Sequence, residues 1–261
     1  MTAPITDSIA ENKAGIIGDQ ARSAVIVNHL PFYYAIHLNE PCNQQCIMCV
    51  PSGKHGPAEL SYEGFVELFD QIKPFAEHIT LIGGEPLMYP HIAEVLELLA
   101  AHPVAVTINT NATMLGGKID DRLLSLHELH LKCSIDAVTR ETYRRIRGRD
   151  HFLRVTDRLS RFADRARARP SIRLIPVFVV MRENLHEVVP FLDFAATLSP
   201  ERVEFHPVRH VGSWLVENGT GWTFDGSQQV CEAFPDEFNE TMRAASARAA
   251  ELGIDVEVHY L

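Results

Sequence analysis

The chain has 261 residues, of which 46% are hydrophobic and 22% charged, and these proportions are ordinary for a globular protein with a sizeable core. Its formal net charge of -10 makes nucleic acid an unlikely partner, because phosphate binding depends on Lys and Arg. The apolar stretches are too short to span a bilayer, and residues 1–20 lack the basic start and apolar core of a signal peptide. We therefore expect a cytoplasmic protein without a membrane anchor.

Residues 1–31 show weak periodicity and are predicted to form an extension packed on the body. From residue 32 onward, apolar runs typical of buried strands alternate with segments of helical spacing. Strands are predicted at 32–38, 78–82, 104–109, 129–135, 172–180 and 203–208, and helices at 60–75, 90–101, 120–126, 139–169 and 185–198. Six such β/α units predict an α/β fold with a parallel sheet, either doubly wound or curled toward a barrel.

Residues 209–261 break this alternation and are predicted to form a C-terminal extension. It would consist of a loop containing Gly and Trp at 212–226, an amphipathic helix at 235–253 and a last strand at 254–261. The body of the protein is then 32–208. Within it, the helical segment 139–169 is rich in Arg, a good helix former, which predicts a charged and solvated helix face.

Three cysteines stand close together as Cys42, Cys46 and Cys49. In a cytoplasmic chain such a cluster indicates metal ligation rather than disulfides. Iron–sulfur clusters are usually held by four Cys, so three thiolates would hold a 4Fe-4S cluster and leave one iron open to a substrate or cofactor. The alternatives are a zinc site completed by His37 or His55 and plain buried thiols.

Further polar motifs follow the next three predicted strands. The run Gly83-Gly84-Glu85-Pro86 follows the second strand, Asn109 and Asn111 the third, and Ser134 and Asp136 the fourth. Functional groups of parallel α/β folds gather at the carboxyl ends of the strands. We therefore expect these motifs to meet the cysteine loop at one edge of the sheet.

The cysteine spacing, followed one helix later by the Gly-Gly-Glu motif, resembles the radical S-adenosylmethionine (SAM) enzymes over residues 32–208. The resemblance implies a partial TIM barrel (β/α)6, with a short N-terminal extension and a C-terminal α/β extension. It implies a 4Fe-4S cluster and SAM as cofactors, and a one-electron donor of the flavodoxin or ferredoxin type as a partner.

The resemblance also implies roles for the motif residues. Cys42, Cys46 and Cys49 would ligate three irons and be essential for catalysis, while SAM chelates the fourth iron. SAM itself would be contacted by eight residues. Met48 would pack on the adenine, and Gly83 and Gly84 would let the backbone approach the methionyl group. Glu85 would accept a hydrogen bond from the methionyl ammonium, and Arg147 would pair with the carboxylate. Ser134 and Asp136 would contact the ribose or the carboxylate, and Asn111 would add a further contact.

Some residues have a second interpretation. Asp136 is also suited to a helix N-cap or turn. Val177 and Val179 fit an adenine pocket or plain core, and His206 and His210 fit a substrate site or a structural role.

The implied reaction starts when an electron from the reduced cluster cleaves SAM to methionine and a 5'-deoxyadenosyl radical. The radical would abstract hydrogen from a peptide or small-metabolite substrate, as in an oxidoreductase or maturase, and the 209–226 loop with Trp214 and Trp222 would be a substrate lid. The alternatives are an isomerase or methyltransferase using the same radical, and a structural or redox-sensing Fe-S module. Only Cys231 follows the barrel, so the auxiliary-cluster cysteines of SPASM or twitch members are lacking; either one cluster suffices or an extension is missing.

Overall fold

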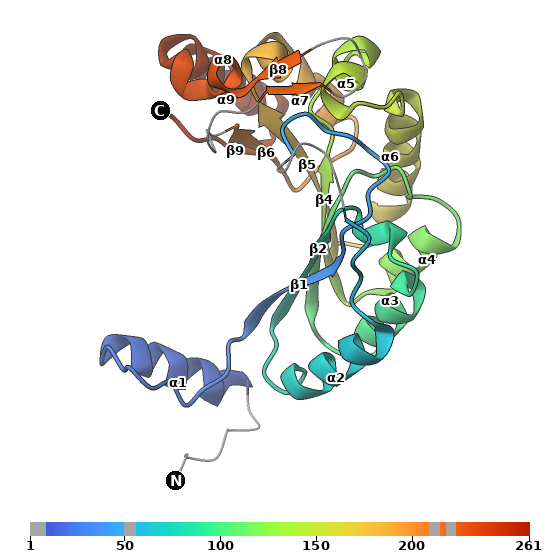
Figure 1. The fold of residues 1–261 in the computed structure, drawn as a ribbon, viewed down its shortest axis with the longest axis vertical. Coiled ribbons are helices and arrows are strands. Elements are labelled where there is room, and N and C mark those ends of the chain that lie inside the picture. Colours follow the sequence, from blue (N-terminus) through green and yellow to red (C-terminus); the bar gives the residue numbers. More distant parts are fainter. Residues whose placement is uncertain (1–8, 50–55, 209–214, 218–222) are drawn as a thin grey trace.

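Seven parallel strands form one curved sheet in the computed structural model, which describes residues 9–49, 56–208, 215–217 and 223–261. The strands are β1 (Tyr33–Asn39), β2 (His78–Gly83), β3 (Ala105–Thr110), β4 (Glu128–Ser134), β5 (Ile172–Val180), β6 (Arg202–Pro207) and β9 (Asp255–Glu257), paired in that order. The sheet bends into a crescent that is open on one side (Figure 1). This arrangement confirms the predicted α/β fold and partial barrel.

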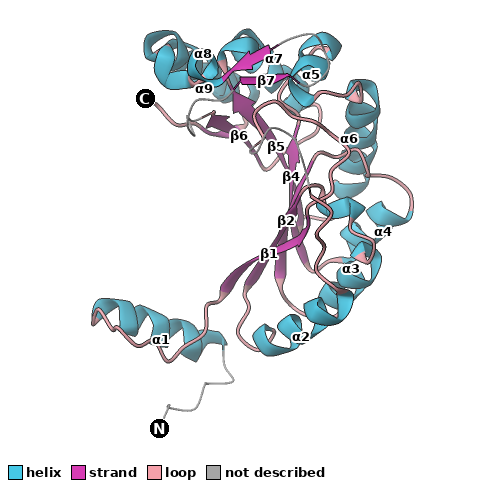
Figure 2. Ribbon diagram, in the orientation of Figure 1, coloured by secondary structure: helices cyan, strands magenta, loops and turns pink. Residues whose placement is uncertain are grey.

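Helices cover the convex side of the sheet, as the cyan and magenta elements of Figure 2 show. They are α2 (Tyr62–Ile72), α3 (Ile92–Ala100), α4 (Lys118–Ser125), α5 (Arg140–Arg147), α6 (Phe152–Ala166) and α7 (Val188–Ala196), with 3-10 turns η1 (Pro86–Met88) and η2 (Arg182–Glu187). Alternate strand residues pack against these helices: Ile79, Leu81 and Leu131 are fully buried. The core therefore lies between sheet and helices, and it leaves the strand ends to polar residues.

The N-terminal extension contains helix α1 (Ile9–Ala21), which extends away from the helical layer (Figure 1). Its Lys13 pairs with Glu77 at 2.7 Å and lies over the ring of Phe32. No helix among the described residues has both the length and the apolar composition that crossing a membrane requires.

The C-terminal extension joins the main sheet. Helix α9 (Pro235–Leu252) lies against α7, where Arg248 pairs with Asp193 at 2.6 Å, and β9 pairs in parallel with β6. The predicted loop at 212–226 is wrong in its described part, because β7 (Leu215–Glu217) and β8 (Thr223–Asp225) form an antiparallel pair there. Two short helical pieces, α8 (Gly226–Gln229) and η3 (Cys231–Ala233), lead into α9.

The single helix predicted over 139–169 is wrong, since the chain forms two helices, α5 and α6. Helix α5 ends at Gly148, which has a left-handed φ of 68°. That conformation is the common C-terminal cap of a helix and is easily adopted only by Gly. The periodicity of the two helices is similar, which is why the pattern alone did not separate them. The break places Arg147 in the last turn of α5, facing the barrel.

The concave side of the sheet carries a buried carboxylate, Glu204 of β6. Its oxygens accept hydrogen bonds from Lys132 at 2.8 Å, from Arg202 at 2.6 Å and from His206 at 3.1 Å. Burial by itself raises the pKa of Glu204, but these donors outweigh it and lower the pKa to about 2. Glu204 therefore stays ionised inside the barrel and links β4 to β6.

We predict that Gly148→Ala destabilises the protein by about 1–2 kcal/mol, because Ala in the left-handed region brings its Cβ against the following carbonyl. The matched control is Gly18→Ala within α1, where a right-handed helical residue gains from Ala. Urea unfolding followed by circular dichroism measures both. Equal effects of the two changes would contradict the capping role of Gly148.

The Glu204 cluster predicts a pH dependence of stability. Since the folded pKa lies near 2, below the ordinary 4.5, its contribution is present above pH 4.5 and is lost as the pH falls toward 2. We expect Glu204→Gln to be about 2 kcal/mol less stable at pH 7, allowing for screening at the half-exposed partners. The difference in unfolding free energy between wild type and Glu204→Gln should be smaller at pH 3 than at pH 7. An equal difference at both pH values would exclude this contribution of ionised Glu204 to stability.

Candidate functional site

A pocket of about 260 Å³ lies at the carboxyl edge of β1 to β4. It gathers ten of the eleven residues predicted to hold the cluster or SAM, together with Gln44, Asn109 and Thr110. Its lining is Cys42, Gln44, Cys46, Met48, Cys49, Gly83, Gly84, Glu85, Asn109, Thr110, Asn111, Ser134 and Arg147. Asp136 is the residue that does not line it.

The cysteine loop is held in place by α5. The backbone N–H of Gln45 donates to the carbonyl of Arg147, and that of Ile47 donates to the carbonyl of Ile146, both at 3.0 Å. The side chain of Gln44 donates to the Tyr143 hydroxyl at 2.8 Å. The C-terminal half of α5 therefore fixes residues 44–47, which lie on both sides of Cys46.

The two glycines at the end of β2 lie directly against the start of the cysteine loop. A Cβ on Gly83 would meet the carbonyl oxygen of Asn39 at 2.5 Å, and one on Gly84 would meet that of Glu40 at 2.0 Å. Only Gly permits such an approach of two backbones. This close packing explains why both positions require Gly, which could not be inferred from the sequence. The predicted contact of the two glycines with the methionyl group stays a prediction.

The Glu85 carboxylate joins the ends of β2 and β3. It is 1% exposed and accepts hydrogen bonds from Thr110 Oγ1 at 2.6 Å, Asn111 N at 2.7 Å and Leu87 N at 3.1 Å. Burial raises its pKa, and these donors oppose that rise. Sequence reasoning missed Thr110; the signal available was a hydroxyl at the end of an otherwise apolar strand.

The three thiols are partly or wholly enclosed. Burial raises the pKa of Cys46 to about 11 and also raises the pKa values of Cys42 and Cys49. Two side-chain donors approach the sulfurs: Arg147 Nη1 lies 3.4 Å from Cys46 Sγ, and Asn111 Nδ2 lies 3.7 Å from Cys42 Sγ. Such N–H donors stabilise thiolates and tune the potentials of iron–sulfur clusters.

This donor set fits a 4Fe-4S cluster better than a single ion. Within the described ranges, no group of three or more His, Cys, Asp or Glu is placed to hold one metal ion. A cluster needs no such convergence, because each thiolate binds a different iron. For the zinc alternative, His37 lies on β1 with its side chain exposed, and His55 lies outside the described residues.

Arg147 and Asp136 form a buried ion pair behind the pocket. Their Nη2 and Oδ2 atoms are 2.6 Å apart, with the side chains 6% and 0% exposed. Burial acts to lower the pKa of Arg147, but Asp136 and Cys46 raise it on balance. Nη2 is engaged by Asp136 in this ion pair, whereas Nε of Arg147 forms no hydrogen bond with any described residue. Arg147 therefore retains one donor for an anionic group.

Asp136 lies behind Arg147 and does not line the pocket, and its predicted SAM contact stays a prediction. Its Oδ1 accepts from Val179 N at 2.7 Å, its carbonyl accepts from Asn184 Nδ2 at 2.9 Å, and its φ is 61°. Burial raises the pKa of Asp136, whereas Arg147 lowers it. The structure thus places Asp136 beneath Arg147, which it orients.

The remaining candidates lie beside the pocket or outside the described residues. Val179 and Met48 pack on the small apolar cluster of Ile47, Ile146, Met181 and Val208. His206 lies on β6, and its Nε2 donates to Glu204. His210, Trp214 and Trp222 fall outside the described residues.

Sequence and structure comparisons agree with this geometry. Residues 38–195 match the family model described as the Radical SAM superfamily. The mycofactocin maturase of Mycobacterium ulcerans is 27% identical over 72% of this chain and 56% of its own length. A probable GTP 3',8-cyclase of Saccharolobus islandicus is 30% identical over 66% of the chain and 56% of its own length. The chain thus spans little more than half the length of these curated relatives.

Solved structures show the same fold. SuiB from Streptococcus suis bound to S-adenosylmethionine superposes with a TM-score of 0.73 at 13% identity, over 95% of this chain and 54% of SuiB. SuiB bound to its precursor peptide SuiA gives 0.70 at 13% identity, over 94% of this chain and 52% of SuiB. With the family model matching more than half of its residues, the chain belongs to the radical SAM superfamily.

Proposed function

We propose that this chain is the barrel of a radical SAM enzyme that cleaves SAM reductively and modifies a peptide. The observation that carries the proposal is the single pocket in which the three thiols, the Gly-Gly-Glu turn and Arg147 meet. These residues come from three separate stretches of the chain. A purely structural Fe-S module would not require a cavity beside its thiols.

The residues present fit both cofactors. Cys42, Cys46 and Cys49 would hold the cluster, and Arg147 Nε, which has no hydrogen-bond partner among the described residues, would receive the SAM carboxylate. Glu85, held by three donors, would receive the SAM ammonium. When bound, the cluster and SAM supply a one-electron cleavage that yields an alkyl radical able to abstract hydrogen.

The chain itself contributes position and enclosure. The hydrogen bonds from the cysteine loop to α5, and the contact of that loop with Gly83 and Gly84, fix the thiols relative to Glu85. Rigid placement of reacting groups is worth several kcal/mol of the barrel's catalytic effect. Burial of Cys46 and Glu85 excludes water from the rear of the pocket.

A peptide is the substrate class that the relatives favour. One curated relative is named a maturase, and SuiB was solved with its precursor peptide. A nucleotide is the second candidate, because probable GTP 3',8-cyclases are also among the relatives.

Anaerobic reconstitution with iron and sulfide, followed by dithionite and SAM, should yield 5'-deoxyadenosine. Cys46→Ala should reduce its formation by at least 100-fold, since the cluster loses one of three protein ligands. Cys133→Ala, which changes a fully buried thiol of the core, is the control and should retain activity. Chromatography measures the product. Equal yields from both variants would contradict the proposal, and SAM-dependent consumption of added GTP would favour the second candidate.

The Glu85 contacts generate a separate prediction. Thr110→Val removes the 2.6 Å hydrogen bond to Glu85 and should weaken SAM binding about 5- to 30-fold, the effect of roughly 1–2 kcal/mol. Thr107→Val on the same strand is the control, because Thr107 contacts His78 rather than Glu85. Equilibrium dialysis of the reconstituted protein with labelled SAM measures both affinities. A similar loss in both variants would show a general disturbance of β3.

A further inference from the structure

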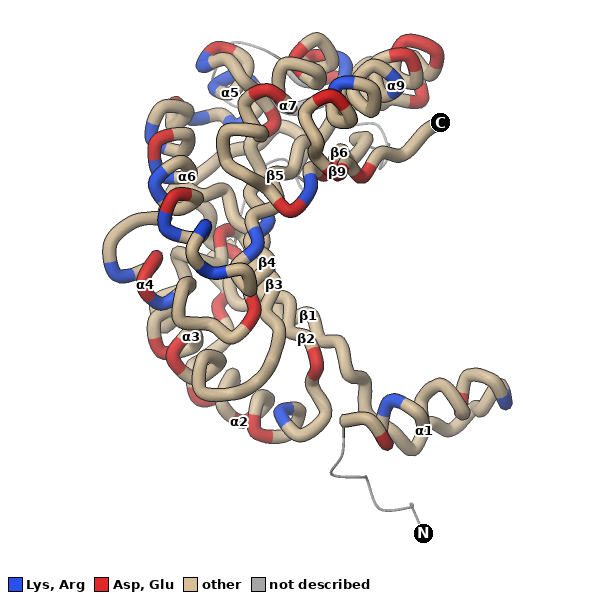
Figure 3. Tube along the Cα trace, turned by 180° about the vertical axis from the view of Figure 1, so that it is seen from behind, with Lys and Arg blue, Asp and Glu red and all other residues tan. Residues whose placement is uncertain are grey.

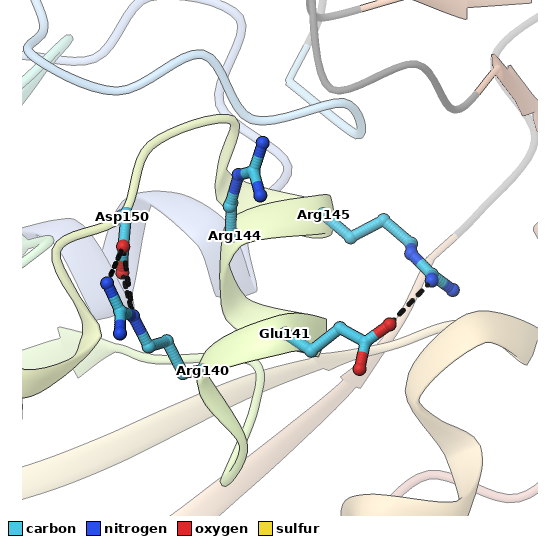
Figure 4. A pocket seen from close by; sticks show the side chains of 5 residues that line it. All are labelled: Arg140, Glu141, Arg144, Arg145 and Asp150. Carbon is cyan, nitrogen blue, oxygen red and sulfur yellow. Dashed lines mark hydrogen bonds and ion pairs between the residues drawn. The ribbon is translucent and has the colours of Figure 1, made fainter.

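Many charged residues of the outer helices pair with one another. Figure 3 shows basic and acidic residues interspersed along α5 and α6. At a cavity of about 490 Å³ beside α5, Arg140 pairs with Asp150 and Arg145 pairs with Glu141 (Figure 4). The pocket at the strand ends is different, because two side-chain N–H groups lie against sulfur atoms there.

The side chain of Asn111 is one of these two donors. Its Nδ2 lies 3.7 Å from Cys42 Sγ and donates to Asn43 Oδ1 at 2.9 Å. Its Oδ1 accepts from the backbone N–H of Thr113 at 3.0 Å and from the Thr113 hydroxyl at 2.6 Å. A side-chain amide has two N–H donors and two acceptor lone pairs. All four are engaged within the protein, so the buried amide of Asn111 has no hydrogen-bonding group left for SAM.

Three side chains form a closed ring of hydrogen bonds beside Cys42. Asn111 donates to Asn43, Asn43 Nδ2 donates to the Thr113 hydroxyl at 2.7 Å, and this hydroxyl donates back to Asn111. Because each group donates to the next, the bonds polarise one another. Reversing the Asn111 amide would set its oxygen against Asn43 Oδ1 and the Cys42 sulfur. The ring therefore fixes the N–H end of the amide toward the sulfur.

The backbone around Asn111 holds this arrangement in place. The N–H of Asn111 donates to Glu85 at 2.7 Å, and the carbonyl of Thr113 accepts from Arg158 on α6. Ala112, between Asn111 and Thr113, is fully buried and has a φ of 61°. This left-handed conformation is unfavourable for residues other than Gly and persists only where the surroundings enforce it. The position of the Asn111 side chain is therefore strongly specified.

We propose that Asn111 positions an N–H group on the Cys42 sulfur and thereby raises the reduction potential of the 4Fe-4S cluster, instead of contacting SAM. This inference rests on the proposed function, in which Cys42 is a cluster ligand. On reduction one electron enters the cluster, and part of the added charge falls on the thiolate sulfurs. A hydrogen bond to sulfur stabilises that charge. No bond breaks and no proton moves at Asn111.

Asn111 is better suited than Arg147 to test the effect of such a hydrogen bond. Arg147 also contacts a sulfur, that of Cys46, but it carries a charge and pairs with Asp136. Its removal would change several interactions at once. Asn111 is neutral, so its replacement by an apolar side chain changes no charge beside the cluster.

The test measures the reduction potential of the reconstituted protein without SAM, by redox titration followed by electron paramagnetic resonance. Asn111→Leu removes the donor at similar size and should make reduction about tenfold less favourable, which lowers the midpoint potential by about 59 mV. Asn239→Leu is the same change on α9, where Asn239 contacts the backbone of Leu261, and should leave the potential unchanged. Equilibrium dialysis should give SAM affinities within about twofold of the wild type for both variants.

Thr113 offers a second pair of variants. Thr113→Val removes the hydroxyl and opens the ring, so the Asn111 amide loses its fixed orientation and reduction should become about threefold less favourable. Thr113→Ser keeps the hydroxyl and should retain the wild-type potential. This pair decides the question if Asn111→Leu does not retain a cluster.

The possible contrary results are distinct. A wild-type potential for Asn111→Leu would overturn the inference, and a loss of SAM affinity at unchanged potential would show that Asn111 contacts SAM instead. Equal shifts for Thr113→Val and Thr113→Ser would exclude the ring as the cause. Failure of the wild type to take up a reducible cluster would refute the proposed function itself, whereas a cluster whose potential does not depend on Asn111 would refute this inference alone.

Discussion

The buried guanidinium of Arg147 is the group on which the rest of the site depends. It contacts Asp136 on one side and the Cys46 sulfur on the other, while its own carbonyl receives the N–H of Gln45. A buried cation is tolerated only when negative groups surround it. Asp136 supplies one, and the Cys46 sulfur lies within 3.4 Å of Nη1. The end of α5, the end of β4 and the cysteine loop are thereby brought together by a single charge.

A second set of contacts fixes the opposite wall of the pocket. Glu85 ties the turn after β2 to the end of β3, and the glycines before it allow the cysteine loop to lie against that turn. Both walls are thus built from strand ends and the residues that follow them. Because core packing on the convex side of the sheet holds each strand in place, the residues at the strand ends that form the pocket are also held in fixed positions.

Most of the fold could be predicted because strands and helices alternate with clear apolar patterns, and strand 172–180 matches β5 at both ends. The break between α5 and α6 at Gly148 could not be predicted, because apolar periodicity continues on both sides of it. The thiols, the Gly-Gly-Glu turn and Arg147 were found from local motifs. The contacts of Thr110, Gln44 and Tyr143 were not found, because they join residues up to 99 positions apart and no single stretch of sequence encodes such a meeting.

The pairing of β9 with β6 has a consequence for dividing this chain into parts. A boundary at residue 208 follows the change in sequence pattern, yet the sheet continues across it through Arg202, Val203 and Glu204. A fragment cut there would expose the full edge of β6 and the face of α7 that α9 covers. Free strand edges pair with other chains, so such a fragment would tend to self-associate. A division of the chain that keeps the sheet intact therefore includes residues through 257, beyond the limits of the catalytic motifs.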